Sequence, residues 1–105
     1  MQAPHITEAE SAVLDALWRR GPLSAFQLMA EVRSRQAWGD ATIKTLLGRL
    51  MRKGAVLSER VDGALRYRAL IERTAYLERE IQAVVDRLFQ GDPKALSAFL
   101  DARRH

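Results

Sequence analysis

One stretch, Asp40 to Gly54, limits most strongly what this chain can fold into. Its apolar side chains recur at i, i+3, i+4, i+7 and i+8, which is the spacing of a helix with one buried face. The stripe consists of Ile43, Leu46, Leu47, Leu50 and Met51. Asp40 is a candidate N-cap, and Gly54 is a candidate C′ residue. The stretch therefore predicts an amphipathic helix that ends just before Gly54.

The opposite face of this helix carries small residues, hydroxyls and cations, and no acid. Such a face can fit a groove of phosphates and base edges. An amphipathic helix whose outer face is merely solvated is the other interpretation, and this stretch alone leaves both open. The candidate DNA contacts are Ala41, Thr45, Gly48, Arg49 and Arg52 opposite the stripe, Thr42 and Lys44 on its flanks, and Lys53 in the basic last turn.

The positive charge of the chain is concentrated around the same stretch. The formal net charge is +4, and residues 40–73 hold all of it, with eight Lys and Arg against four Asp and Glu. Cations and acids balance in residues 1–39 and again in residues 74–105. A local excess of this kind indicates a surface that contacts a polyanion.

Composition excludes several classes of function. The 105 residues include no cysteine, so disulfides, thiolate metal sites and cysteine nucleophiles are absent. The only histidines, His5 and His105, lie near the ends, and no carboxylate pair, Ser/His/Asp set or glycine-rich phosphate loop is placed for catalysis. We therefore expect no enzyme, metal or cofactor. Without an apolar run of about 18 residues or a signal peptide, we expect a cytoplasmic protein with no membrane insertion.

Two short helices are predicted ahead of the central one. Residues 7–10 and 24–27 each form a capping box, and apolar residues follow both boxes at helical spacing. The pair Gly21–Pro22 separates the two helices, and Leu23 is expected in a short extended segment. Residues 34–39 then connect the second of these helices to the central helix. A short helix joined by a tight connection to a helix that presents small and basic residues is the helix-turn-helix arrangement.

After Gly54 the pattern changes from helix to strand. Residues 56–61 are β-prone, and Asp62–Gly63 is a strong signal for a two-residue hairpin, because a type I′ turn needs positive φ at both positions. Residues 64–70 alternate and place Arg66 and Arg68 on one face. We expect a two-stranded wing on which Arg66 and Arg68 contact a phosphate backbone. Protection of an exposed sheet edge is the other explanation for these arginines.

The last third of the chain predicts two more helices with apolar faces. Gly91 ends the first, and Asp92–Pro93 starts the second. Two helices of this size cannot bury such faces alone, so we expect them to pair with a second copy. Packing onto the winged helix is the alternative. The candidate dimerisation residues are Leu77, Ile81, Val84, Val85, Leu88 and Phe89 in the first helix, and Leu96, Phe99 and Leu100 in the second.

The order of elements predicts a mainly α fold with a small β-hairpin. Residues 6–70 are expected to form a winged helix-turn-helix DNA-binding domain, and residues 71–105 a helical dimerisation region. A winged helix that serves as a protein-interaction module, without specific DNA binding, is the rival function. The acid-free outer face of the central helix favours DNA.

The central stretch resembles the third-helix signature of the penicillinase-repressor (BlaI/MecI-type) family. The resemblance extends over about residues 6–100 and includes the first helix and its link to the second. The matching strings are Trp38-x3-Thr42-Ile43-Lys44-Thr45-Leu46-Leu47-x-Arg49-Leu50-x2-Lys53-Gly54, Ile6-Thr7-Glu8-Ala9-Glu10 and Leu17-Trp18-x2-Gly21-Pro22-Leu23-Ser24-Ala25.

This resemblance implies a bacterial homodimeric repressor that binds a dyad operator in double-stranded DNA, in β-lactam-resistance or cell-envelope regulation. By position it places Thr42, Lys44, Thr45 and Arg49 in the major groove, and Arg66 or Arg68 against the backbone beside the wing. In such repressors a membrane-bound sensor metalloprotease ends repression by cutting the C-terminal region. Two departures stand out. The family's Asn-Phe cleavage pair is replaced in Ser97-Ala98-Phe99-Leu100, and the sequence ends at His105, where many members continue into another helix. The cysteine cluster of copper-sensing relatives is also absent, so we expect no copper sensing of that kind.

Overall fold

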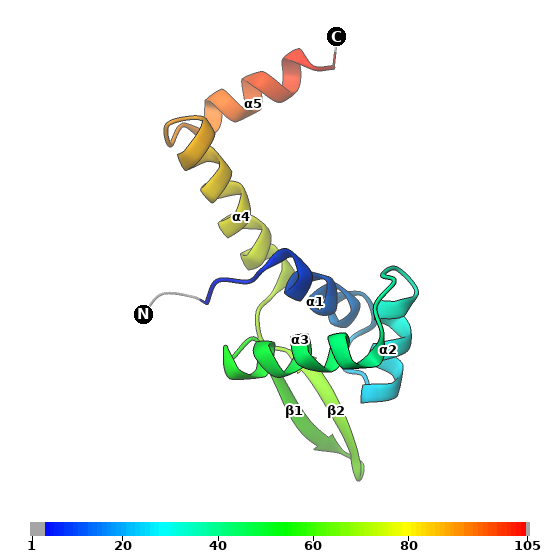
Figure 1. Ribbon diagram of the computed structural model, residues 1–105. Helices are drawn as coiled ribbons and strands as arrows, with labels where there is room; N and C mark the ends of the chain where they lie inside the picture. Colours follow the sequence, from blue (N-terminus) through cyan, green and yellow to red (C-terminus); the bar gives the residue numbers. More distant parts are fainter. Residues whose placement is uncertain (1–3, 105) are drawn as a thin grey trace. The chain divides into compact units, whose positions relative to one another are not determined.

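The elements of the computed structural model, which describes residues 4–104, follow the order that the sequence predicts. They are α1 (Glu8–Arg20), α2 (Ala25–Arg33), α3 (Asp40–Arg52), β1 (Val56–Val61), β2 (Ala64–Ala69), α4 (Arg73–Leu88) and α5 (Pro93–Ala102) (Figure 1). The fold class, mainly α with a small hairpin, is confirmed. The chain forms two compact units, and the first ends at Glu72, two residues beyond the expected boundary. Between residues 4 and 104, no helix is both long and apolar enough to cross a membrane.

Both capping boxes form and fix where α1 and α2 begin. The Thr7 hydroxyl accepts the backbone N–H of Glu10 at 3.2 Å, and Glu10 Oε1 accepts the backbone N–H of Thr7 at 2.9 Å. Ser24 and Gln27 make the same two bonds at the start of α2, at 3.2 and 3.0 Å. Each box pairs N–H groups that the helix itself leaves unpaired.

The predicted cap of α3 is wrong. Gly39 is the N-cap residue and makes no side-chain capping bond, while Asp40 is the first helical residue. At that position the negative Asp40 carboxylate lies in the first turn, where it interacts favourably with the positive end of the helix dipole and stabilises the helix. It also forms an ion pair with Arg33, the last residue of α2. The ion pair therefore ties the start of α3 to the end of α2.

The core of the first unit consists of apolar side chains from α1, α2, α3, β1 and the short segments that precede α1, α2 and β1. Met51, expected in the α3 stripe, is instead 38% exposed. Eight residues beyond Ile43 the helix has turned about 80° away from it, so Met51 lies at the margin of the stripe. Among residues 4–72, fourteen apolar residues are buried: Ile6, Val13, Leu14, Ala16, Leu17, Leu23, Leu28, Val32, Ile43, Leu46, Leu47, Leu50, Ala55 and Val56.

The wing is an antiparallel hairpin whose base is attached to the start of α2. Asp62 and Gly63 have φ of 53° and 80°, as the predicted turn requires. Leu23 forms an isolated bridge with Tyr67, through hydrogen bonds of 3.1 and 2.7 Å between their backbones. The extended segment expected at Leu23 is confirmed, and it adds one residue of a third strand to the hairpin.

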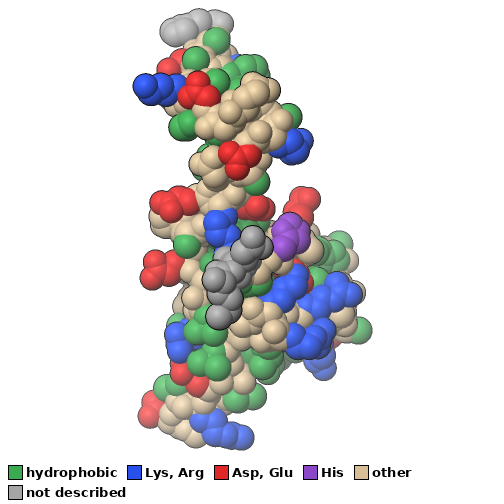
Figure 2. Space-filling model, turned by 90° about the vertical axis from the view of Figure 1, so that its left-hand side faces the viewer, with side chains coloured by type: hydrophobic (Ala, Val, Ile, Leu, Met, Phe, Trp, Pro, Cys, Tyr) green, Lys and Arg blue, Asp and Glu red, His purple; other side chains and the backbone are tan. Residues whose placement is uncertain are grey.

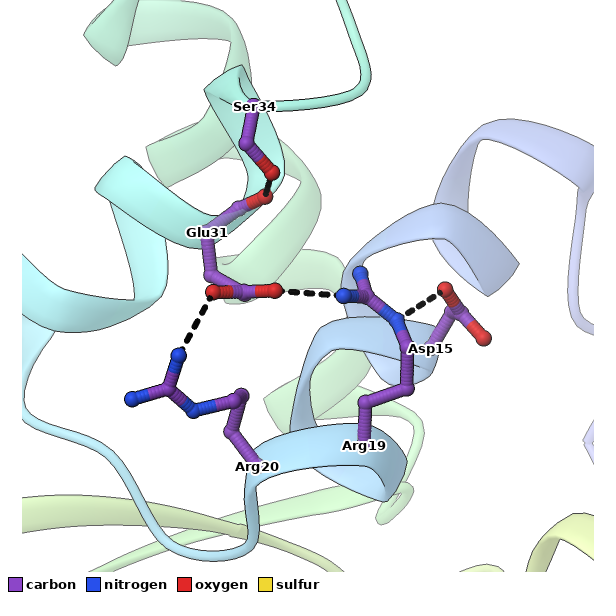
Figure 3. A network of polar contacts seen from close by, with 5 residues as sticks. All are labelled: Asp15, Arg19, Arg20, Glu31 and Ser34. Atoms are coloured by element: carbon purple, nitrogen blue, oxygen red, sulfur yellow. Dashed lines mark hydrogen bonds and ion pairs between the residues drawn. The ribbon is translucent and has the colours of Figure 1, made fainter.

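A network of ion pairs joins α1 to α2 (Figure 3). Arg19 lies between Asp15, whose carboxylate is 2.8 Å from Nε, and Glu31 of α2. Arg20 also pairs with Glu31, at 3.3 Å. The hydrogen bond to Asp15 raises the pKa of Arg19 further above its already high value. Single exposed pairs stabilise a protein little, but a shared network restrains the angle between two helices.

Another ion pair, between Lys53 and the buried Glu10, joins the end of α3 to the start of α1. Glu10 is 1% exposed, and its Oε1 accepts a hydrogen bond from Lys53 Nζ at 2.6 Å. Lys53 Nζ also donates to the His5 carbonyl at 2.9 Å. Burial raises the pKa of Glu10, but hydrogen bonds from Lys53 and Thr7 together lower it more, so its pKa lies below the usual value.

The second unit consists of α4 and α5. Asp92 accepts the backbone N–H of Lys94 at 3.0 Å and Pro93 is the first helical residue, so the predicted restart of the helix is confirmed. The rings of Phe89 and Phe99 pack with centroids 6.0 Å apart and an interplanar angle of 53°. This tilted contact joins the two helices.

Replacing Lys53 by Met should destabilise the first unit, because Glu10 would remain buried without its cation. Breaking a buried ion pair costs about 3–5 kcal/mol. Since the Lys53 side chain is 30% exposed, we expect a loss of about 2–3 kcal/mol in the free energy of unfolding. Urea unfolding monitored by tryptophan fluorescence measures it. In the matched control Arg20→Met, which breaks an exposed pair, the loss should stay below about 1 kcal/mol.

Acidification separates the ion pair from simple packing in this test. Because the pKa of Glu10 is lowered on folding, its charge stabilises the fold above the ordinary glutamate pKa, about 4.3. That contribution is lost as the pH falls through the lowered value. The stability difference between the unmodified protein and Lys53→Met should therefore close at acid pH. A difference that stays constant from pH 7 to pH 3 would show that Lys53 acts through packing alone.

Candidate nucleic-acid interface

The outer face of α3 presents the residues that the helical spacing places there. Ala41, Thr42, Lys44, Thr45, Arg49 and Arg52 are exposed, and Gly48 is half-buried. Their cations are not used by the fold, since Lys44, Arg49 and Arg52 form no ion pair with any residue from 4 to 104. Several Lys and Arg side chains lie close together on the surface of the first unit, in the lower half of Figure 2.

Two residues of this face, Gly48 and Ala41, have side chains that protrude little from the helix. A Cβ built at Gly48 would lie 3.5 Å from Nη1 of Arg52, so the Arg52 guanidinium lies along the helix beside the glycine. Ala41, two turns earlier, adds only a methyl group. Small side chains between cations let the backbone of a helix approach a duplex closely.

Lys53, a predicted DNA contact, lies outside this face. Its ammonium pairs with Glu10 and donates to the His5 carbonyl. Ten residues beyond Ile43 the helix has turned about 80° to the side of the stripe away from Met51, and that side faces α1. The structure therefore uses Lys53 in the fold rather than on the free outer face.

The wing face that carries Arg66 and Arg68 is less basic than expected. The register places Glu59 opposite Arg66 and Leu57 opposite Arg68, so an acid lies on the same face as the two arginines. Glu59 Oε1 accepts a hydrogen bond from Arg68 Nε at 3.1 Å. Both arginines are half-buried. Of the two, only Arg66 has no ion pair with the described residues.

The opposite wing face carries a cation that the sequence reading missed, Arg60. The register pairs Arg60 with Leu65 and Ser58 with Tyr67. Tyr67 lines the same hollow as Lys44, so this face of the wing continues from α3. Arg60 is exposed, and its Nη1 donates to the Gly63 carbonyl at 3.2 Å. The alternation of residues 56–61 would have predicted this, because Arg60 lies four residues after the buried Val56 and therefore on the same face of the strand.

The second unit leaves a broad apolar surface uncovered, and green side chains reach the surface of its helices in Figure 2. Ile81, Leu88, Phe99 and Leu100 are 53%, 54%, 53% and 47% exposed. Val85 differs, because at 1% exposure it has no surface left for a partner. The remaining predicted dimerisation residues, Leu77, Val84, Phe89 and Leu96, are half-buried.

Three helices followed by a two-stranded wing, with a cationic outer face on the third helix, define the winged-helix class of DNA-binding fold. The Bacillus licheniformis BlaI monomer solved with the blaP half-operator is similar, with a TM-score of 0.64 and 27% identity over 71% of this chain and 92% of that chain. The BlaI DNA-binding domain alone gives a TM-score of 0.62 at the same identity and coverage. A MarR family protein from Bacillus stearothermophilus, 19% identical with a TM-score of 0.55, shares the fold.

The chain belongs to the penicillinase repressor family, whose model matches residues 6–104. The penicillinase repressor of Bacillus licheniformis is 26% identical over 88 residues, which are 84% of this chain and 69% of the relative. The methicillin resistance regulatory protein MecI of Mammaliicoccus sciuri is 24% identical over 86 residues, 82% of this chain and 70% of the relative. The resemblance in the sequence is confirmed, and the family is one of regulators rather than enzymes.

Replacing Arg60 by Ala should weaken binding to duplex DNA about equally for every sequence, because a phosphate contact carries no base information. Loss of one such contact should also flatten the slope of log affinity against log salt by about one. Fluorescence anisotropy at several salt concentrations measures both effects. Arg68→Ala is the matched control, since its guanidinium already pairs with Glu59, and it should change the slope less. A larger effect from Arg68 than from Arg60 would reverse this assignment of the wing faces.

Proposed function

We propose that this chain is a bacterial transcriptional repressor that binds a dyad operator in double-stranded DNA as a homodimer. One observation carries the proposal: the outer face of α3 holds Lys44, Arg49 and Arg52, which the described fold leaves without ion pairs. The similar BlaI monomer was solved with a half-operator, which supports DNA as the partner.

The proposed reading helix is α3, inserted in the major groove. Lys44 and Arg49 have the donors that recognise O6 and N7 of guanine, and the Thr45 methyl and hydroxyl suit thymine and other base edges. Thr42 and Arg52 lie near the two ends of α3, and we expect them to contact backbone phosphates rather than base edges. Ala41 and Gly48 provide the close approach.

The proposed role of the wing is to steady this complex. Arg60 lies on the wing face that continues from α3, and Arg66 lies on the other face. Contacts of either residue with phosphates would fix the register of the domain on the duplex without reading sequence. The wing therefore contributes affinity, and α3 contributes specificity.

The proposed dimer forms through the second unit. Ile81 and Leu88 lie seven residues apart on α4 and are both more than half exposed. Together with Phe99 and Leu100 on α5 they form an apolar surface of the kind that marks a protein interface. A symmetric dimer would present two copies of α3 to half-sites about one turn of the duplex apart, or a multiple of it.

The regulated genes are proposed to belong to β-lactam resistance or cell-envelope regulation, and the names of the penicillinase repressor and methicillin resistance regulatory protein relatives support the first. A sensor metalloprotease that ends repression would have to cut near residues 97–100 of α5. That segment is exposed, which favours access, but it lacks the Asn-Phe pair expected of the family. The repressor role therefore does not depend on cleavage at this site.

Replacing Thr45 by Ala should reduce discrimination between the operator and random DNA by about 1–3 kcal/mol, if Thr45 contacts a base edge. Arg52→Ala should instead weaken both kinds of DNA and flatten the salt slope by about one. Titration of the two variants against a selected operator and a scrambled duplex separates these effects. If the unmodified protein prefers no duplex at any salt concentration, the winged helix is a protein-interaction module and the proposal fails.

Replacing Ile81 by Glu should split the dimer, because the new carboxylate would be buried without a partner. Ala83→Glu is the matched control, since Ala83 is exposed on α4 about 160° from Ile81. It adds the same charge and should leave the dimer intact. Sedimentation equilibrium measures both variants. A monomeric unmodified protein at micromolar concentration, or an Ile81→Glu variant that still dimerises, would contradict the proposed interface.

A further inference from the structure

A hollow of about 260 Å³ lies between the start of α2, the outer part of α3 and the base of the wing. Ile43 and Leu47 of α3 are its most buried lining residues, while Met29, Met51 and Tyr67 contribute apolar or aromatic surface from three elements. All of them belong to the first unit. The hollow is partly open to solvent and borders the face proposed to read DNA.

The size and lining of the hollow suit a single aromatic ring. A cavity of roughly 150 Å³ lined by apolar side chains takes up benzene, and this hollow is larger. Ligand pockets combine such apolar walls with a few polar groups that orient the ligand. Here the polar groups are the Lys44 ammonium and the Tyr67 hydroxyl, and no lining residue is acidic.

The charge at the rim determines the kind of ligand. Lys44 lines the hollow and has no ion pair with the residues that the structure describes. The Arg52 guanidinium lies 3.5 Å from a Cβ built at Gly48, another lining residue, so a second cation is close to the same rim. Two cations without an acid beside an apolar hollow complement an anion with a flat apolar body.

We infer that this hollow binds a small aromatic carboxylate, with the ring between Met29, Leu47 and Tyr67 and the carboxylate on Lys44. The inference deepens the proposed function and rests on it for its consequence. Lys44 cannot pair with this carboxylate and with DNA at the same time, so the ligand and the operator compete. By linkage, a ligand that weakens operator binding is itself bound more weakly by the DNA-bound protein.

The test uses benzoate as the probe and the 105-residue chain labelled with ¹⁵N. A titration without DNA should shift the amide signals of Met29, Lys44, Leu47 and Tyr67, with a Kd on the order of 1 mM, as expected for a ligand of nine heavy atoms. Benzyl alcohol has the ring without the charge and should bind about tenfold more weakly. Lys44→Met should show the same loss, and Lys44→Arg should restore binding.

Ala25→Leu gives a variant that fills the hollow without changing Lys44, because Ala25 lines the hollow at the start of α2. This variant should bind the selected operator normally and lose its response to benzoate. Benzoate should weaken operator binding by the unmodified protein, while acetate at equal ionic strength should not.

Three results would overturn the inference: signal shifts spread over the whole chain, equal effects of benzoate and acetate, or an unchanged benzoate response in Ala25→Leu. The titration without DNA keeps the inference separate from the proposed function. A chain that binds no operator but shifts locally with benzoate retains the site, and a chain that binds the operator but shows no local shift loses it.

Discussion

The ion pair between Glu10 and Lys53 determines how α3 is held. An apolar stripe sets which way a helix faces. Lys53 reaches Glu10 at 2.6 Å and anchors the end of α3 to the start of α1. The pair of Arg33 and Asp40 anchors the other end to α2. Ion pairs thus fix both ends of the proposed reading helix, and the outer face between them remains available for DNA.

The acids of the first unit divide its cations into two groups. Arg19, Arg20, Arg33, Lys53 and Arg68 each pair with an acid, mostly on a neighbouring element, and so stabilise the fold. The remaining cations of α3, together with Arg66, have no such partner among residues 4–104. The net charge of +4 therefore understates how basic the proposed interface is, because paired cations contribute little field beyond their partners.

Local sequence signals predicted most of the fold. They could not predict features that depend on contacts between residues far apart in the sequence. Capping boxes, the Asp62–Gly63 turn and the period of each segment depend on residues a few positions apart, so a single sequence is sufficient to read them. The role of Lys53 depends on Glu10, 43 residues earlier in the sequence, whereas the helical pattern predicted a DNA contact. Val85 was predicted in the dimer interface, but it is buried at 1% exposure. Arg60 was missed for a different reason. Its face of the wing follows from the alternation of β1, but that this face borders α3 follows from packing, because Tyr67 lines the same hollow as Lys44.

The position of Lys44 joins two proposed activities in one side chain. It lies about 100° from Ile43 around α3, at the boundary between the buried stripe and the outer face. A residue at this boundary faces both the hollow against α2 and the wing and the groove of a duplex. Ala41, near the centre of the outer face, contacts only the duplex in this arrangement. Competition between a ligand and DNA therefore requires no movement of the fold, because a single ammonium serves both sites.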